Sequence, residues 1–141
     1  KGSAWRYTTL DDLKKIKLGA ISGYGYGDDI TAYIEKNPQQ VQLTVGDNAL
    51  EQNIKKLAAG RIDALIESPS VFNAKLKDLH MEDQFEQAGT LSDIVDVYVA
   101  CSPAKESSKT YAMLISDGTE ELRKNGELAK ILAKYGLKDW K

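Results

Sequence analysis

Residues 17–27 read KLGAISGYGYG, a short apolar run that passes into a loop with three glycines. An apolar run of this length, bounded by turn residues, predicts a buried strand over residues 17–22. From Asp28 onward the sequence looks helical. The order of strand, loop and helix is the unit from which α/β folds are built, and it sets the fold class that we expect.

The same unit recurs in the next forty residues. Residues 41–45 alternate apolar and polar side chains, which is typical of a half-buried strand, and a helix with one apolar face follows. Gly60 supplies a left-handed stop for that helix, and residues 61–66 return as a strand with an apolar centre. Because parallel neighbours need crossover connections, this alternation predicts a mainly parallel sheet flanked by helices.

Polar residues at the starts of the helices are spaced for capping. Asp47 or Asn48 can cap the helix after the second strand, and Glu51 completes a capping box if Asn48 is the cap. At the next helix, Pro69 suits the first position, where its missing N–H costs nothing, and Ser68 precedes it as the expected cap.

Towards the C-terminus the strand-like and helical patterns separate. A further short strand is expected over residues 85–89, and residues 94–101 are the most strand-like run because they are dense in β-branched and aromatic residues. Residues 105–124 and 127–135 have helical spacing, although Gly118 weakens the first of these helices at its middle. These C-terminal helices have no matching strands, so we expect them to cover a different sheet.

Composition limits the classes of partner. The 141 residues include 42% hydrophobic residues, and 19 basic against 21 acidic side chains give a net charge of −2 without a long block of either sign. We therefore expect no nucleic-acid partner. No apolar run approaches the roughly 20 residues that span a bilayer, so we expect a chain that is not membrane-embedded.

The glycine-rich loop is the expected ligand loop, because strand ends and helix N-termini in open α/β sheets present N–H groups that attract carboxylate or phosphate. The alternative is that these glycines only permit a tight turn. A nucleotide loop is not favoured, because the spacing is G-x-G-x-G, no Walker lysine follows, and Asp28 and Asp29 add negative charge. The candidate binding residues here are Ser22, Gly23, Tyr24, Gly25 and Tyr26.

Two more candidates, Glu67 and Ser68, follow the strand over residues 61–66 and lie at the same edge of the predicted sheet. Glu67 can accept a hydrogen bond from a ligand ammonium group, or it can be a solvated carboxylate. Tyr24 and Tyr26 can stack on a ligand or pack against helices, and we expect only one of them to face inward.

Catalytic chemistry has little support. His80 is the only histidine, and its acidic neighbours do not have a recognised metal-ligand spacing, so we place it at an exposed helix end. Cys101 is the only cysteine, which excludes an intrachain disulfide, and it has no glycine elbow or activating base. We therefore expect no enzyme activity, no metal site and no cofactor.

Three segments together resemble a known family: LGAISGYGYGD at 18–28, VGDNALEQNIKKLAAGRIDALIES at 45–68, and LRKNGELAKILAKYGLKDW at 122–140. In this order they resemble the extracellular solute-binding proteins of family 3, which serve ABC importers of polar amino acids. The resemblance covers nearly the whole chain. It implies a lobe of the periplasmic-binding-protein type II kind.

Family members close two α/β lobes over a ligand. By this resemblance residues 1–101 are the second lobe with hinge strands at both ends, and residues 102–141 are C-terminal helices of the first lobe, whose N-terminal portion is absent. Because the apolar faces of these helices then need cover, we expect them to fold back on the α/β lobe or to self-associate.

The resemblance also implies a function, which is binding of an amino acid or a related small polar solute for delivery to an ABC transporter membrane permease. The protein would act on the periplasmic or extracellular side of a bacterial membrane. A ligand-sensing domain of a receptor and an accessory module of a cell-wall lyase stay open as alternatives. The chain departs from the family where a ligand carboxylate and amine are usually held, because Tyr24-Gly25 replace short hydroxyl residues and Ser68 replaces an aspartate.

Overall fold

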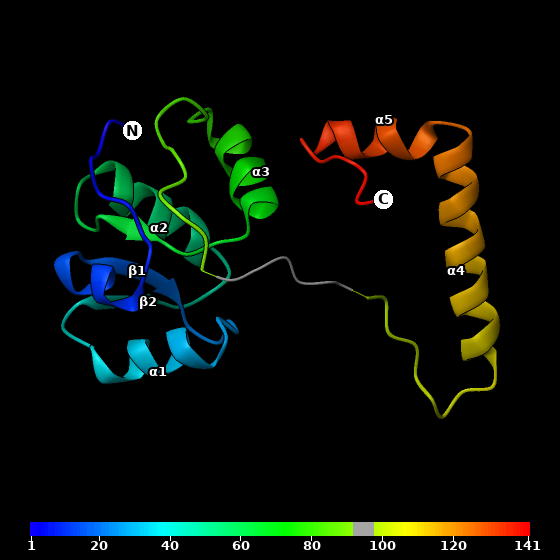
Figure 1. The fold of residues 1–141 in the computed structure, drawn as a ribbon, viewed down its shortest axis with the longest axis horizontal. Coiled ribbons are helices and arrows are strands. Elements are labelled where there is room, and N and C mark those ends of the chain that lie inside the picture. The colour runs from blue at the N-terminus through cyan, green and yellow to red at the C-terminus, as the bar shows by residue number, and fades with distance from the viewer. Residues whose placement is uncertain (92–97) are drawn as a thin grey trace. The chain divides into compact units, whose positions relative to one another are not determined.

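The computed structural model describes residues 1–91 and 98–141 and divides the chain into two compact units, Lys1–Leu91 and Ser92–Lys141 (Figure 1). The first unit begins with a 3-10 helix and then alternates strands with helices. Its elements are η1 (Leu10–Lys15), β1 (Leu18–Ile21), α1 (Asp28–Lys36), β2 (Val41–Thr44), α2 (Ala49–Ala58), β3 (Ala64–Leu65) and α3 (Pro69–Leu79).

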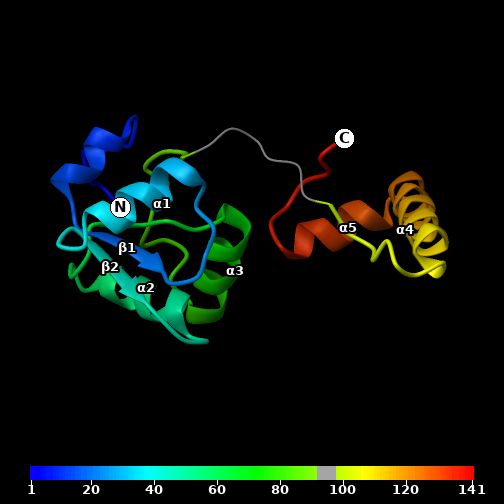
Figure 2. The same ribbon diagram turned by 90° about the horizontal axis from the view of Figure 1, so that it is seen from below.

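The three strands form one parallel sheet in the order β2-β1-β3, which confirms the predicted α/β class. Leu18 of the central strand pairs with Val41 on one side and with Ala64 on the other. The chain moves from β1 to β2 and then back across β1 to β3. Because such crossovers are right-handed, this reversal places α1 and α2 on opposite faces of the sheet, as Figures 1 and 2 show.

Each face of the sheet has its own apolar cluster. The cluster under α1 contains Leu18, Ala20 and Ile30, and the cluster under α2 and α3 contains Ile21, Ile54 and Leu76. All four residues of β1 are therefore buried, as is usual for a central strand that is covered on both sides.

Asn53 links helix α2 to two strands through a buried polar network. Its side-chain Nδ2 donates to the carbonyl of Ala20 in β1 (3.2 Å), and its Oδ1 accepts from the hydroxyl of Thr44 in β2 (2.6 Å). Asn53 and Thr44 are almost fully buried. The Nζ of Lys56, one turn further along α2, donates to the same Thr44 oxygen at 2.6 Å.

The helix ends agree only in part with the predicted caps. Gly60 has a φ of +65° and ends α2 as expected, with hydrogen bonds from the N–H of Gly60 to the carbonyl of Leu57 and from Arg61 to Lys56. Asn48 stands at the N-cap of α2 but makes no side-chain capping bond. The predicted capping box is wrong, because the Glu51 carboxylate pairs with Lys55 instead (2.6 Å).

Strand lengths also differ from expectation. β3 covers only residues 64–65 of the predicted 61–66, and the strand expected over 85–89 does not form. That segment instead makes a single backbone bond from Tyr7 N–H to Ala88 C=O (3.0 Å). Of the strand expected over 94–101, residues 94–97 lie outside the described residues, and residues 98–101 have no strand assignment.

The second unit contains α4 (Ser107–Lys124) and α5 (Glu127–Lys134), which run in different directions on either side of a short turn (Figure 1). α4 continues through Gly118, so the expected weak point does not interrupt it. The Arg123 guanidinium binds the Asp139 carboxylate (2.7 and 3.0 Å) and lies over the Trp140 ring. α4 buries no residue, and α5 buries Leu128.

In the ranges 1–91 and 98–141, none of the helices has the length and apolar character to cross a membrane. The predicted domains 1–101 and 102–141 differ from the two compact units by ten residues at the boundary, and that assignment stays a prediction.

Gly19 gives the first testable prediction, because a Cβ at this position would lie 2.4 Å from Cδ1 of the buried Ile62. Gly19→Ala should therefore destabilise the first unit by about 1–3 kcal/mol, measured by hydrogen exchange of the β1 amides. Ile62→Val removes the clashing methyl and alone should cost about 0.5–1.5 kcal/mol. The double variant should be more stable than the sum of the single losses predicts; simple additivity would contradict this packing.

His80 gives the second prediction. It ends α3 in the left-handed region with φ 54° and ψ 45°, and it is exposed. His80→Gly should stabilise the first unit by about 0.5–1 kcal/mol, because glycine relieves the left-handed strain but gains freedom in the unfolded chain. Urea unfolding followed by α3 amide signals measures this change. His80→Ala keeps the strain and should give no gain; an equal gain in both variants would rule out the backbone explanation.

Candidate functional site

The candidate site lies where the carboxyl ends of two neighbouring strands lead to opposite faces of the sheet. β1 continues into α1 on one face, whereas β3 continues into α3, which packs with α2 on the other. In open α/β sheets, a crevice opens at such a reversal and receives ligands. We call this region the carboxyl edge, and it consists of the loop 22–27 and residues 66–68.

β1 and β3 separate within this edge. The N–H of Ile66 donates to the carbonyl of Gly19 at 3.3 Å, but the N–H of Ile21, which the alternation of the strand directs towards the same side, does not reach β3. It donates to the phenol oxygen of Tyr26 at 2.7 Å. The Tyr26 hydroxyl therefore supplies the hydrogen-bond acceptor that a longer β3 would have provided.

Tyr26 comes from the loop half of the carboxyl edge and Glu67 from the half that follows β3. Burial raises the pKa of the Tyr26 phenol, the hydrogen bond with Ile21 lowers it, and the negative charge of Glu67 raises it further. The net shift is upward, so the phenol is protonated at neutral pH.

Glu67 has one satisfied and one unsatisfied oxygen. Its Oε1 accepts a hydrogen bond from the N–H of Ser68 at 2.8 Å. Its Oε2 is buried and has no hydrogen-bond partner among the described residues, a state that it shares with the Tyr33 hydroxyl. Tyr33 lies inside the core under α1, whereas Glu67 lies at the edge. A buried carboxylate oxygen without a donor is costly, so a ligand that brings an N–H group is favoured here.

The two tyrosines of the loop have different positions, as expected. The Tyr26 ring packs against the core under α1, while Tyr24 is half exposed. Their ring centroids are 6.2 Å apart with an angle of 39° between the planes. Tyr24 therefore presents an aromatic surface to solvent beside the Tyr26 ring.

The loop offers fewer donors to an anion than the sequence suggests. The N–H of Ser22 donates to Thr44 of β2, and the N–H of Tyr24 donates to Ile21. Gly23 and Gly27 have positive φ angles of 83° and 78°, so the turn itself requires glycine there. The loop contains no basic side chain and ends at two aspartates. This charge pattern favours a cationic group over an anion.

Ser68 stands at the N-cap of α3, but its predicted capping bond is absent, and its hydroxyl pairs with the Ser70 hydroxyl at 2.9 Å. His80 lies at the exposed far end of α3 as predicted. Among residues 1–91 and 98–141, no group of His, Cys, Asp and Glu side chains is arranged to hold a metal ion.

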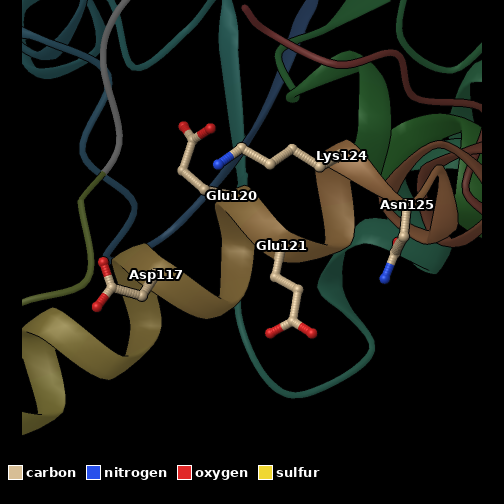
Figure 3. Close-up of a pocket in the computed structure, with 5 residues that line it drawn as sticks. All are labelled: Asp117, Glu120, Glu121, Lys124 and Asn125. Atoms are coloured by element: carbon tan, nitrogen blue, oxygen red, sulfur yellow. The ribbon is translucent and has the colours of Figure 1, made fainter.

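A surface depression in the second unit is a poor alternative. It is lined only by α4 and the residue after it, and Figure 3 shows the side chains spread around the helix instead of converging. The Glu120 carboxylate is already bound by Arg123 (2.8 Å) and Lys141 (2.6 Å). The lining residues are Asp117, Glu120, Glu121, Lys124 and Asn125.

Sequence reasoning located the edge but missed two of its features. It did not foresee that the Tyr26 hydroxyl would bind the Ile21 amide, because that bond depends on where β3 ends. It also gave no reason to distinguish the two Glu67 oxygens, of which Oε1 accepts a hydrogen bond and Oε2 does not.

Compared with models of protein families, with curated proteins and with solved structures, the chain matches none.

Tyr26 gives the third prediction. Tyr26→Phe removes the acceptor of the Ile21 N–H and leaves a part-buried donor unsatisfied, so we expect a loss of about 1–3 kcal/mol in stability. Faster hydrogen exchange at the Ile21 amide measures the loss. Tyr24→Phe is the matched control and should change stability by no more than about 0.5 kcal/mol, because Tyr24 is half exposed. Equal effects of the two variants would contradict the assigned role.

Proposed function

We propose that the carboxyl edge captures a small polar solute that carries a protonated amine, without making or breaking a bond in it. The amine would donate to Glu67 Oε2, and Tyr24 would cover the ligand from the solvent side. The observation that carries this proposal is the buried Glu67 Oε2, which has no hydrogen-bond partner among residues 1–91 and 98–141.

The sign of the local charge supports an amine over a carboxylate. Glu67 and the two aspartates at the start of α1 are all acidic, and the loop 22–27 adds no positive charge. An ammonium group forms charge-assisted hydrogen bonds with a carboxylate, which are stronger than bonds between neutral groups. The amine would therefore offset the cost of burying the Glu67 Oε2 without a donor.

We place this binding in a family 3 solute-binding protein, of which residues 1–101 would be the second lobe and residues 102–141 helices of the first. The three segments of similar sequence support this assignment, and so do the parallel sheet after the glycine loop and the helical character of the C-terminal residues. In such a protein, ligand binding stabilises closure of the two lobes. Amino acids and related amines are the expected solutes.

The proposed family assignment implies a biological role. This role is delivery of the solute to an ABC importer on the periplasmic or extracellular side of a bacterial membrane. The role requires recognition and not catalysis. The one histidine stands at the other end of α3 from Ser68, about 18 Å away at roughly 1.5 Å per residue, so it would not touch a solute at the edge.

The fourth prediction tests binding directly. In an NMR titration of the ¹⁵N-labelled chain with amino acids, simple amines and small carboxylates, compounds with an amine should shift the Gly23, Tyr26 and Glu67 amide signals. Glu67→Gln should weaken that binding about tenfold or more, because a hydrogen bond to a charged group contributes roughly 1.5–3 kcal/mol.

Glu35→Gln is the matched control, since it removes one exposed carboxylate from α1, and it should leave binding unchanged. Shifts with carboxylates alone would contradict the assignment of an amine. Equal affinity in the Glu67 variant and the wild type would show that Glu67 does not bind the solute. If no compound shifts the amide signals, the binding proposal is wrong.

A further inference from the structure

A second charged region lies away from the carboxyl edge, at the C-terminal end of α2. It is a shallow depression of about 320 Å³, which we call the basic depression. Three of its lining side chains are cationic, one is an amide, and none is acidic, although the whole chain has a net charge of −2. The lining residues are Gln52, Lys55, Lys56, Ala59 and Arg61.

Two of the three cations have no carboxylate partner within residues 1–91 and 98–141. Lys55 is neutralised by Glu51 at 2.6 Å. The Lys56 amine is bound only by neutral oxygens, the Thr44 hydroxyl at 2.6 Å and the Asn53 Oδ1 at 3.4 Å. The Arg61 guanidinium makes no hydrogen bond or ion pair with the residues of the ranges 1–91 and 98–141.

The fold brings these two cations together. The N–H of Arg61 donates to the carbonyl of Lys56 at 2.9 Å, because the left-handed turn at Gly60 folds the chain back on the last turn of α2. The Lys56 amine is also fixed in place by the buried network of Asn53 and Thr44, and Gln42 donates to the Arg61 carbonyl. A ligand would therefore not bear the entropic cost of ordering the Lys56 side chain.

The helix dipole explains only part of this arrangement. Cations are favoured near the C-terminus of a helix, and Lys55 in the last turn fits that explanation. Lys56 directs its amine towards Thr44 of β2 and not towards the last carbonyls, and Arg61 lies beyond the helix. Two cations that lack carboxylate partners and line one depression attract an anion.

We propose that the basic depression binds a phosphate group, held by the Lys56 ammonium, the Arg61 guanidinium and the Gln52 amide. A phosphate oxyanion has enough oxygens to accept from all three, and guanidinium groups bind phosphate with two parallel bonds. This site shares no lining residue with the carboxyl edge.

The test is a phosphate titration of the whole 141-residue chain, followed by the ¹⁵N amide signals of Ala59 and Arg61 with ionic strength held constant by NaCl. Saturable shifts with inorganic phosphate or methyl phosphate support the site, and tighter binding of methyl phosphate identifies a phosphate ester as its source. Arg61→Gln and Lys56→Gln should each weaken binding about tenfold, the effect of losing one charged hydrogen bond.

Lys36→Gln is the matched control, because Lys36 also stands in the last turn of a helix but outside the depression. It should change affinity by less than about twofold, as expected for an exposed charge. Arg61→Gln changes an exposed side chain, so it keeps the test valid even if Lys56→Gln disturbs the buried network. Shifts that do not saturate, equal loss in the Lys36 variant, or equal binding of acetate would overturn the proposal.

Discussion

The N–H of Ile21 sets the constraint on which the carboxyl edge depends. A central strand in a parallel sheet needs partners on both sides, but the chain reverses its direction across β1 and β3 stops short. A backbone donor left unsatisfied at that point would be costly, and the Tyr26 hydroxyl satisfies it at 2.7 Å. The loop after β1 is thereby tied to the last residue of that strand. The same reversal of the chain also determines which side chains border the carboxyl edge.

Local patterns in the sequence predicted the places of β1 to β3 and α1 to α3 because each element has its own hydrophobic period, but they also predicted a strand over 85–89 that does not form. Glu67 could be found as a candidate because it directly follows a strand, and all parallel strands end at one edge. Asn53 was missed, since its partners are 9 and 33 residues away and no local pattern marks them. Its position three residues after Leu50, on the apolar face of α2, was the available signal: a polar residue on such a face must find buried partners.

Two regions of the first unit differ in charge. Glu67 at the carboxyl edge and the two aspartates that follow its loop are acidic, while the basic depression has Lys56 and Arg61. Asn53 and Thr44 connect the two, since this buried pair anchors α2 to β1 and β2 and also holds the Lys56 amine. A change in this pair would therefore affect both the packing of α2 and the position of a surface cation.

The ion pair between Arg123 and Asp139 has a consequence for the second unit. It joins residues 16 apart and so closes a ring of chain that contains the whole of α5. Because α4 buries no side chain and α5 buries only Leu128, this ion pair and the Trp140 ring over Arg123 are a large part of what holds the helix pair together. Dissolved ions therefore weaken the helix pair more than the α/β unit, which is held together by buried apolar contacts.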